Sequence, residues 1–234
     1  MRKKQLFNIF ILAASLFFCN YSQAQNNQAS GIHDQVGSKI ADAAFQIIAS
    51  LKSTKYKDFP YTINISKGVY ETDEAGFVTH LLKIAAPDHL SLIPFEEGKF
   101  YHSVADYFNY FLSIKNSGNR LDSAFWKIVY KITDAKRGDI IAWADDYKII
   151  LNSNSHLLII GDDPKQVSDT ENVYEVVVYD ATYKLYNRDI RTPLGGVGYG
   201  YIRFQTDSLK VPAAYQYKVD DVFQKSNIII ARPK

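Results

Sequence analysis

The sequence predicts an α+β protein in which N-terminal helices pack on a mainly antiparallel sheet. Apolar residues recur at three- and four-residue steps in the first half of the chain, whereas the second half carries apolar runs with the shorter period of strands. Helices that precede the strands, instead of alternating with them, are typical of this class. We see no internal repeat and no linker-like tract, so residues 25–234 are expected to form a single domain.

Three amphipathic helices are expected in the first half. The first covers residues 32–51, where apolar side chains fall on one helical face. The second follows Thr72 to Gly76 and ends before Pro87, because a proline cannot donate the backbone hydrogen bond that a helix interior needs. The third covers residues 104–114 and ends near Gly118.

Seven strands are expected after residue 125, each bounded by turn-forming residues. They cover residues 126–132, 139–143, 156–160, 174–180, 199–204, 214–219 and 227–231. A glycine-rich stretch, 195–200, precedes one of these strands. It lacks the following helix that a phosphate-binding loop requires, so we interpret it as a structural turn.

Residues 1–24 have the layout of a cleaved secretory signal peptide, with basic residues at 2–4, an apolar run over 6–18 and a small-x-Ala sequence ending at Ala24. The apolar run is shorter than the roughly 20 residues that span a bilayer. A lipoprotein signal with Cys19 as the lipidated residue is the alternative, which the bulky Phe18 disfavours. We expect a secreted or periplasmic protein without a membrane span after cleavage.

Cleavage at this point would change the charge and the cysteine content. It removes three of the 27 basic residues and none of the 25 acidic ones, which leaves a formal net charge of −1 and no basic surface typical of nucleic-acid binding. The single cysteine, Cys19, leaves with the signal. The remaining chain has no disulfide, thiolate metal site or thiol nucleophile, and we expect no cofactor.

A predicted hairpin would bring a histidine and an aspartate together. If the strands at 156–160 and 174–180 are joined by a turn near Ser168, residues whose numbers sum to about 336 lie opposite each other. His156 then faces Asp180, and directly opposed side chains point to the same side of a sheet. A slip of one residue would move one of them to the other face. Asp73 and Glu74 precede the second helix, where acidic residues are favoured by the helix dipole.

Four segments together resemble the NlpC family of papain-like cell-wall cysteine peptidases. Residues 73–78, Asp-Glu-Ala-Gly-Phe-Val, are similar to the family motif Asp-Cys-Ser-Gly-Phe-Val, whose cysteine is the nucleophile. Residues 136–143 resemble the strand before the family's histidine, 155–160 the histidine strand, and 178–182 the strand with the third polar residue. All four occur in the family's order, over about residues 56–220.

The resemblance implies a papain-like NlpC fold in which His156 is the base and Asp180 orients it, with Glu74 at the cysteine position. A carboxylate cannot form the thioester on which that mechanism depends. Ala75 also replaces the usual serine. We therefore expect a non-catalytic pseudo-peptidase that binds cell-wall peptides, such as peptidoglycan stem peptides, or acts as a scaffold or regulator of a cell-wall protein.

An active hydrolase is the alternative function. Glu74, His156 and Asp180 could together hold a zinc or iron ion, or Glu74 could act as a general base on water. The candidate ligand-binding residues are Asp73, Arg188 and Arg191, since arginine suits carboxylate recognition.

Overall fold

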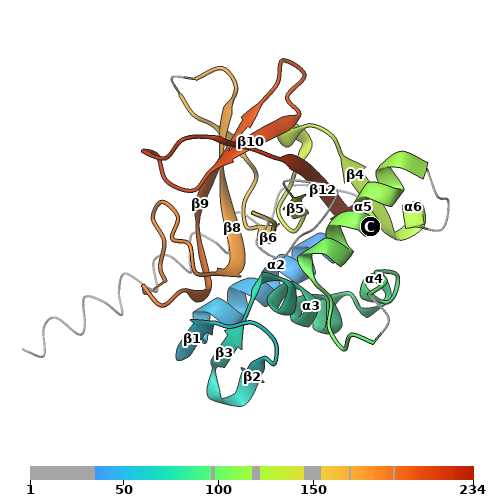
Figure 1. Ribbon diagram of the computed structural model, residues 1–234, viewed down its shortest axis with the longest axis vertical. Helices are drawn as coiled ribbons and strands as arrows, with labels where there is room; N and C mark the ends of the chain where they lie inside the picture. The colour runs from blue at the N-terminus through green and yellow to red at the C-terminus, as the bar shows by residue number, and fades with distance from the viewer. Residues whose placement is uncertain (1–34, 96–97, 118–121, 145–153, 169, 192) are drawn as a thin grey trace, which may run out of the picture. The chain divides into compact units, whose positions relative to one another are not determined.

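The computed structural model describes residues 35–95, 98–117, 122–144, 154–168, 170–191 and 193–234 (Figure 1). The predicted signal peptide and the first residues of the first predicted helix lie outside these ranges. Residues Gln35–Lys234 form one compact unit. None of its described helices is both long and apolar enough to cross a membrane.

The three predicted helices are confirmed, and those of their ends that fall within the described ranges lie within about three residues of the expected ends. A proline explains the break after the second of them: Pro87 occupies the first turn of a further short helix, where its missing N–H has no cost. The described helices are α2 (Gln35–Ala49), α3 (Glu74–Ala85), α4 (Pro87–Ser91), α5 (Val104–Ser117) and α6 (Asp122–Phe125), with 3₁₀ turns η3 (Ile65–Lys67) and η4 (Ile132–Asp134).

The larger sheet contains all seven predicted strands, and every pairing in it is antiparallel. Its order is β11-β10-β9-β8-β6-β5-β12-β4, with β7 paired to β8. The strands are β4 (Trp126–Val129), β5 (Ile140–Ala144), β6 (His156–Ile160), β7 (Lys165–Gln166), β8 (Val173–Thr182), β9 (Gly196–Thr206), β10 (Pro212–Gln216), β11 (Gln224–Lys225) and β12 (Asn227–Pro233).

A second, three-stranded sheet lies between α2 and α3 in the sequence and was not predicted. Its strands are β1 (Ser53–Tyr56), β2 (Thr62–Asn64) and β3 (Val69–Thr72), and β1 pairs with β3 in parallel. Each strand has only three or four residues, so the alternation of more and less buried side chains in β1 and β3 is too short to mark a strand in the sequence. The chain therefore does not place all its helices before all its strands.

The two faces of the larger sheet carry two separate hydrophobic cores. One face packs against α2, α3 and α5, where Phe77 and Leu81 join Leu157 and Ile159. The alternate strand residues, such as Trp143 and Leu158, form the other core with β9 and β10. Figure 1 shows the helices grouped on one side of β5, β6 and β12, with β8, β9 and β10 extending away from them.

The pairing between β6 and β8 differs from the predicted register by two positions. Ile159 pairs with Tyr179 and Ile160 with Val178, so opposed residues sum to 338 and not 336. The turn lies closer to Thr170 than to Ser168, because β7 extends the hairpin and Val167 donates to the carbonyl of Val173. An even displacement keeps each side chain on its face, so His156 and Asp180 are diagonal neighbours on one side of the sheet.

We expect Phe77→Ala to destabilise the fold by about 3–5 kcal/mol, because it opens a cavity where α3 packs on the sheet. The matched control is Phe45→Ala on α2, whose side chain is 48% exposed and whose loss should cost about 0.5 kcal/mol or less. Urea unfolding of both variants measures the difference. Equal losses would contradict the assigned helix packing.

Candidate functional site

The structure brings together the three side chains that the sequence analysis placed in one site. Glu74 is the first residue of α3, His156 the first of β6, and Asp180 lies near the end of β8. His156 Nδ1 is 3.5 Å from Glu74 Oε1, and its Nε2 is 2.6 Å from Asp180 Oδ2. All three residues are buried. The imidazole therefore lies between two carboxylates, one at each ring nitrogen.

The start of α3 fixes the position of Glu74. Asp73 caps the helix by accepting a hydrogen bond of 2.6 Å from the Gly76 amide, and the Tyr61 hydroxyl donates to its second oxygen at 2.8 Å. Burial raises the pKa of Asp73 to about 6, although the Gly76 amide opposes this effect. From β1, the Tyr56 hydroxyl donates to Glu74 Oε2 at 3.1 Å. Both oxygens of Glu74 thus have partners.

The two carboxylates hold His156 in its protonated form. Burial by itself lowers the pKa of this imidazole, but the hydrogen bonds with Asp180 and Glu74 outweigh it and raise the pKa to about 9. Burial raises the pKa of the Asp180 carboxyl. The neighbouring Arg191 guanidinium and His156 outweigh this effect and lower that pKa below its usual range. His156, Asp180 and Arg191 are therefore charged together at neutral pH.

Tyr186 and Arg191 complete the surroundings of Asp180, and the sequence analysis did not assign them this part. The Tyr186 hydroxyl donates to Asp180 Oδ2 and lies 2.8 Å from His156 Nε2. Arg191 donates to Asp180 Oδ1 and, at 3.3 Å, to the Asp180 carbonyl. Its other guanidinium nitrogens bind Asp189 and the Gly196 carbonyl. Asp180 is therefore held from three sides.

Most of the glycine-rich stretch forms the start of β9 instead of a turn, which corrects our interpretation of it. A Cβ on Gly198 would lie 2.6 Å from the Arg191 Cγ atom, and one on Gly200 would lie 2.8 Å from Tyr186 Cβ. Glycines in a strand permit such close approach. These glycines were the sequence feature from which the surroundings of Asp180 could have been predicted, because the Arg191 and Tyr186 side chains pack directly over them.

None of the three candidate ligand-binding residues lines the cavity at this site. The Arg191 side chain is completely buried and neutralises Asp180. Arg188 is exposed, pairs with Glu175 and stacks on the Tyr201 ring at 3.6 Å from its centroid. Asp73 serves as the cap of α3.

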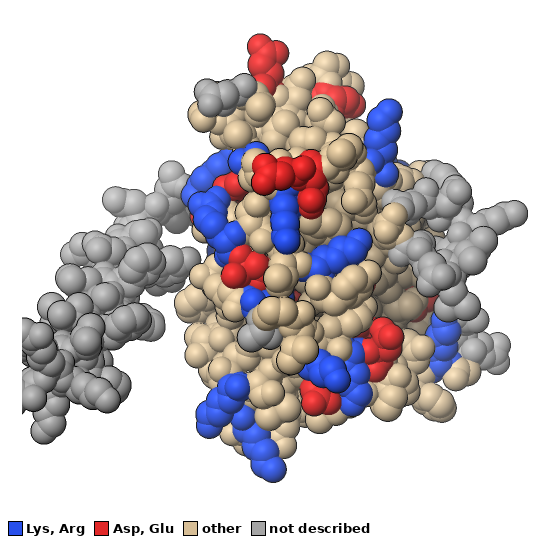
Figure 2. Space-filling model, turned by 60° about the vertical axis from the view of Figure 1, so that its left-hand side comes forward, with Lys and Arg blue, Asp and Glu red and all other residues tan. Residues whose placement is uncertain are grey.

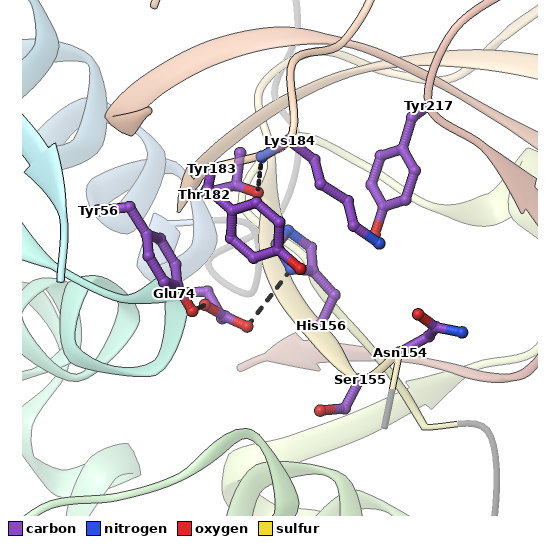
Figure 3. Close-up of a pocket in the computed structure, with 9 residues that line it drawn as sticks. All are labelled: Tyr56, Glu74, Asn154, Ser155, His156, Thr182, Tyr183, Lys184 and Tyr217. Atoms are coloured by element: carbon purple, nitrogen blue, oxygen red, sulfur yellow. Dashed lines mark hydrogen bonds and ion pairs between the residues drawn. The ribbon is translucent and has the colours of Figure 1, made fainter. Parts of the chain in front are cut away.

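A cavity of about 260 Å³ opens above the Glu74–His156 pair (Figure 3). Figure 3 shows Tyr56 and Glu74 on one side of it, Lys184 and Tyr217 on the other, and His156 between them. Its lining residues are Tyr56, Glu74, Asn154, Ser155, His156, Thr182, Tyr183, Lys184 and Tyr217. Asp180 is fully buried beneath this surface. A ligand in the cavity would therefore contact Glu74 and His156 but not Asp180.

The geometry disfavours a metal centre built from these residues. Both ring nitrogens of His156 face carboxylates, on opposite edges of the ring, so the three side chains share no common point for an ion. Across the described ranges, no cluster of three or more His, Asp or Glu side chains has an arrangement that could hold a metal.

Comparisons with known proteins give no match to this chain, whether with family models, curated proteins or solved structures. Function is therefore inferred from the residues of the site and from the sequence motifs that contain them.

We expect the stability contributed by His156 to decrease with rising pH. Its pKa is raised from 6.5 to about 9, so this contribution is complete below pH 6.5 and is lost as the pH rises through about 9, to a total of ~3 kcal/mol. The free energy of unfolding, measured with urea across this pH range, should fall with rising pH in the wild-type protein. In His156→Gln this dependence should be absent. His80→Gln is the control, because burial lowers the pKa of His80 and its titration falls outside the window. An NMR-titrated pKa of His156 at or below 6.5 would contradict the ion-paired geometry.

We expect Arg191→Met to cost about 3–5 kcal/mol, because it leaves the Asp180 carboxylate buried without its main counter-charge. Arg188→Met is the matched control, since it removes an exposed ion pair and should cost about 1 kcal/mol or less. Denaturant unfolding of the two variants gives the comparison. Similar losses for both would mean that Asp180 is not stabilised by Arg191.

Proposed function

We propose that this protein is an exported, non-catalytic member of the NlpC-like, papain-like group and that it binds cell-wall peptides in the cavity above Glu74. The observation that carries the proposal is the clamping of His156 between Glu74 and Asp180. In a cysteine peptidase the equivalent histidine must be free to accept a proton from the nucleophile.

The clamped histidine is a poor base. With a pKa of about 9, about one molecule in a hundred has a neutral imidazole at pH 7. Its Nδ1 faces Glu74, at the position that the resemblance assigns to the nucleophile, and its Nε2 faces Asp180. In an imidazolium both ring nitrogens already carry a proton. The protonated His156 therefore cannot accept a proton from water or from a thiol.

Glu74 is equally poorly placed as a general base on water, which was the alternative function. One of its oxygens faces the imidazolium and the other accepts from Tyr56. Both oxygens thus already have partners, which leaves the carboxylate poorly placed to accept a proton from water. The same pairing that neutralises the buried histidine thus argues against hydrolysis.

The positions of the three residues support the NlpC-like assignment. A residue at a helix N-terminus meets a histidine at the start of one strand and an aspartate on the adjacent antiparallel strand. This is the arrangement that a cysteine, its base and the orienting residue would need. The motif segments quoted from the sequence occupy these elements in the same order.

The cavity supports ligand binding as the remaining function. It is walled by tyrosines and by the polar side chains of Asn154 and Ser155, in a concave site where papain-like enzymes would hold the peptide next to the nucleophile. The cell-wall stem peptide follows from the family resemblance and from the expected export.

We expect the protein to sediment with purified peptidoglycan and to release no peptide from it. Ser155→Trp should abolish sedimentation by filling the cavity, whereas Ser66→Trp, at an exposed position of η3, should not. Mass spectrometry of the supernatant, with and without added zinc, detects any cleavage.

Two outcomes would overturn this function. Sedimentation that Ser155→Trp leaves unchanged would place the binding surface elsewhere. Released peptides that disappear in Glu74→Gln would favour the carboxylate mechanism of an active hydrolase.

A further inference from the structure

Among the residues that the structure describes, the cavity above Glu74 is lined by one cation that no carboxylate neutralises. Of its three charged lining residues, Glu74 and His156 neutralise each other. Within the part of the chain that the structure describes, no ion pair joins Lys184 to an acidic side chain. Its ammonium lies instead 4.7 Å from the centroid of the Tyr217 ring and 6.0 Å from that of Tyr183.

Aromatic rings hold this ammonium at the cavity wall. Tyr217 is stacked on Tyr186, with centroids 5.5 Å apart and an angle of 4° between the planes. Tyr186 is itself fixed by its hydrogen bond to Asp180. The backbone of Lys184 is anchored as well, since its amide donates to the Thr182 hydroxyl at 3.0 Å. The cation therefore has a defined place and still has donors to offer to a ligand.

The charge of the cavity matches a single carboxylate. One ammonium balances one negative charge, whereas a phosphate dianion would leave a charge uncompensated close to Glu74. On the face drawn in Figure 2, basic and acidic side chains are interspersed, so that surface offers no broad positive field to attract polyanions.

The size of the cavity favours the end of a chain over an internal segment. Its volume of about 260 Å³ is below the roughly 300–1,000 Å³ of sites that enclose drug-sized molecules. One or two amino-acid residues fill such a space. The wall opposite Lys184, formed by Tyr56, is suited to the apolar part of the same residue.

We propose that the cavity captures the C-terminal carboxylate of a peptide and that Lys184 selects the free acid over blocked or continuing chains. This inference rests on the proposed peptide-binding function and adds which part of the peptide is recognised. Asn154 and Ser155, at the rim beside His156, are placed to hydrogen-bond the peptide amide.

The test compares two probes that differ in one charge: N-acetyl-Lys-D-Ala as the free acid and as the C-terminal amide. Isothermal titration calorimetry with the purified protein should show the acid binding about tenfold or more tightly, because a charge-assisted contact is lost in the amide. In Lys184→Gln this preference should disappear, and in Lys184→Arg it should remain. The matched control, Lys83→Gln on α3, removes an exposed lysine outside the cavity and should leave the preference unchanged.

Three outcomes would overturn the inference: an acid preference that survives in Lys184→Gln, equal affinity for both probes, or stronger binding of inorganic phosphate than of the acid probe. The pair N-acetyl-Ala-L-Ala and its amide separates this inference from the cell-wall assignment. If the L-peptide acid binds through Lys184 while peptidoglycan does not sediment the protein, carboxylate capture stands and the cell-wall ligand fails. If the protein binds peptidoglycan but shows no preference for the acid probes, the cell-wall ligand stands and carboxylate capture fails.

Discussion

A row of buried charges with alternating sign is the constraint on which the site depends. Glu74, His156, Asp180 and Arg191 follow one another, each in contact with the next. Removing an ion from water costs several kcal/mol even after relaxation, so each member requires its neighbour. The four come from α3, β6, β8 and the segment before β9. Their pairing therefore links the helix start, two strands and a loop into one unit.

Uncharged groups around the row satisfy the bonding capacity that the ion pairs leave open. Tyr56 and Tyr186 donate to the two carboxylates, and the Gly196 carbonyl accepts from Arg191. The Gly196 backbone itself has a φ of +108°, a conformation that side-chain-bearing residues rarely adopt. A half-satisfied buried network would be less stable than an apolar core, which gives a physical reason for this many supporting residues.

One end of the row lines the cavity. The carboxylates of Glu74 and Asp180 contact the two ring nitrogens of His156 and favour its protonated form. The Glu74–His156 ion pair lies at the floor of the cavity. Lys184, which has no acidic partner among the described residues, lines the wall of the same cavity.

Elements with a strong local pattern could be predicted from the amino-acid sequence. These are the three main helices, the strand His156–Ile160 with its exact bounds, and the grouping of Glu74, His156 and Asp180. The grouping held although the β6–β8 register was displaced by two positions, because side chains in a strand alternate with a period of two. Local periodicity fixes which face a residue occupies, even when its partner is misplaced.

The groups that surround the site could not be predicted, because they come from distant parts of the chain. Tyr56 reaches Glu74 from a short strand whose pattern is too brief to detect, and Tyr217 stacks on Tyr186 from a different part of the chain. Arg191 was expected to bind a ligand, as an arginine near a candidate site, but it is buried against Asp180. Residue type tells which charges can pair. Which of them do pair depends on long-range packing, since a buried charge takes the partner that the fold brings within contact distance.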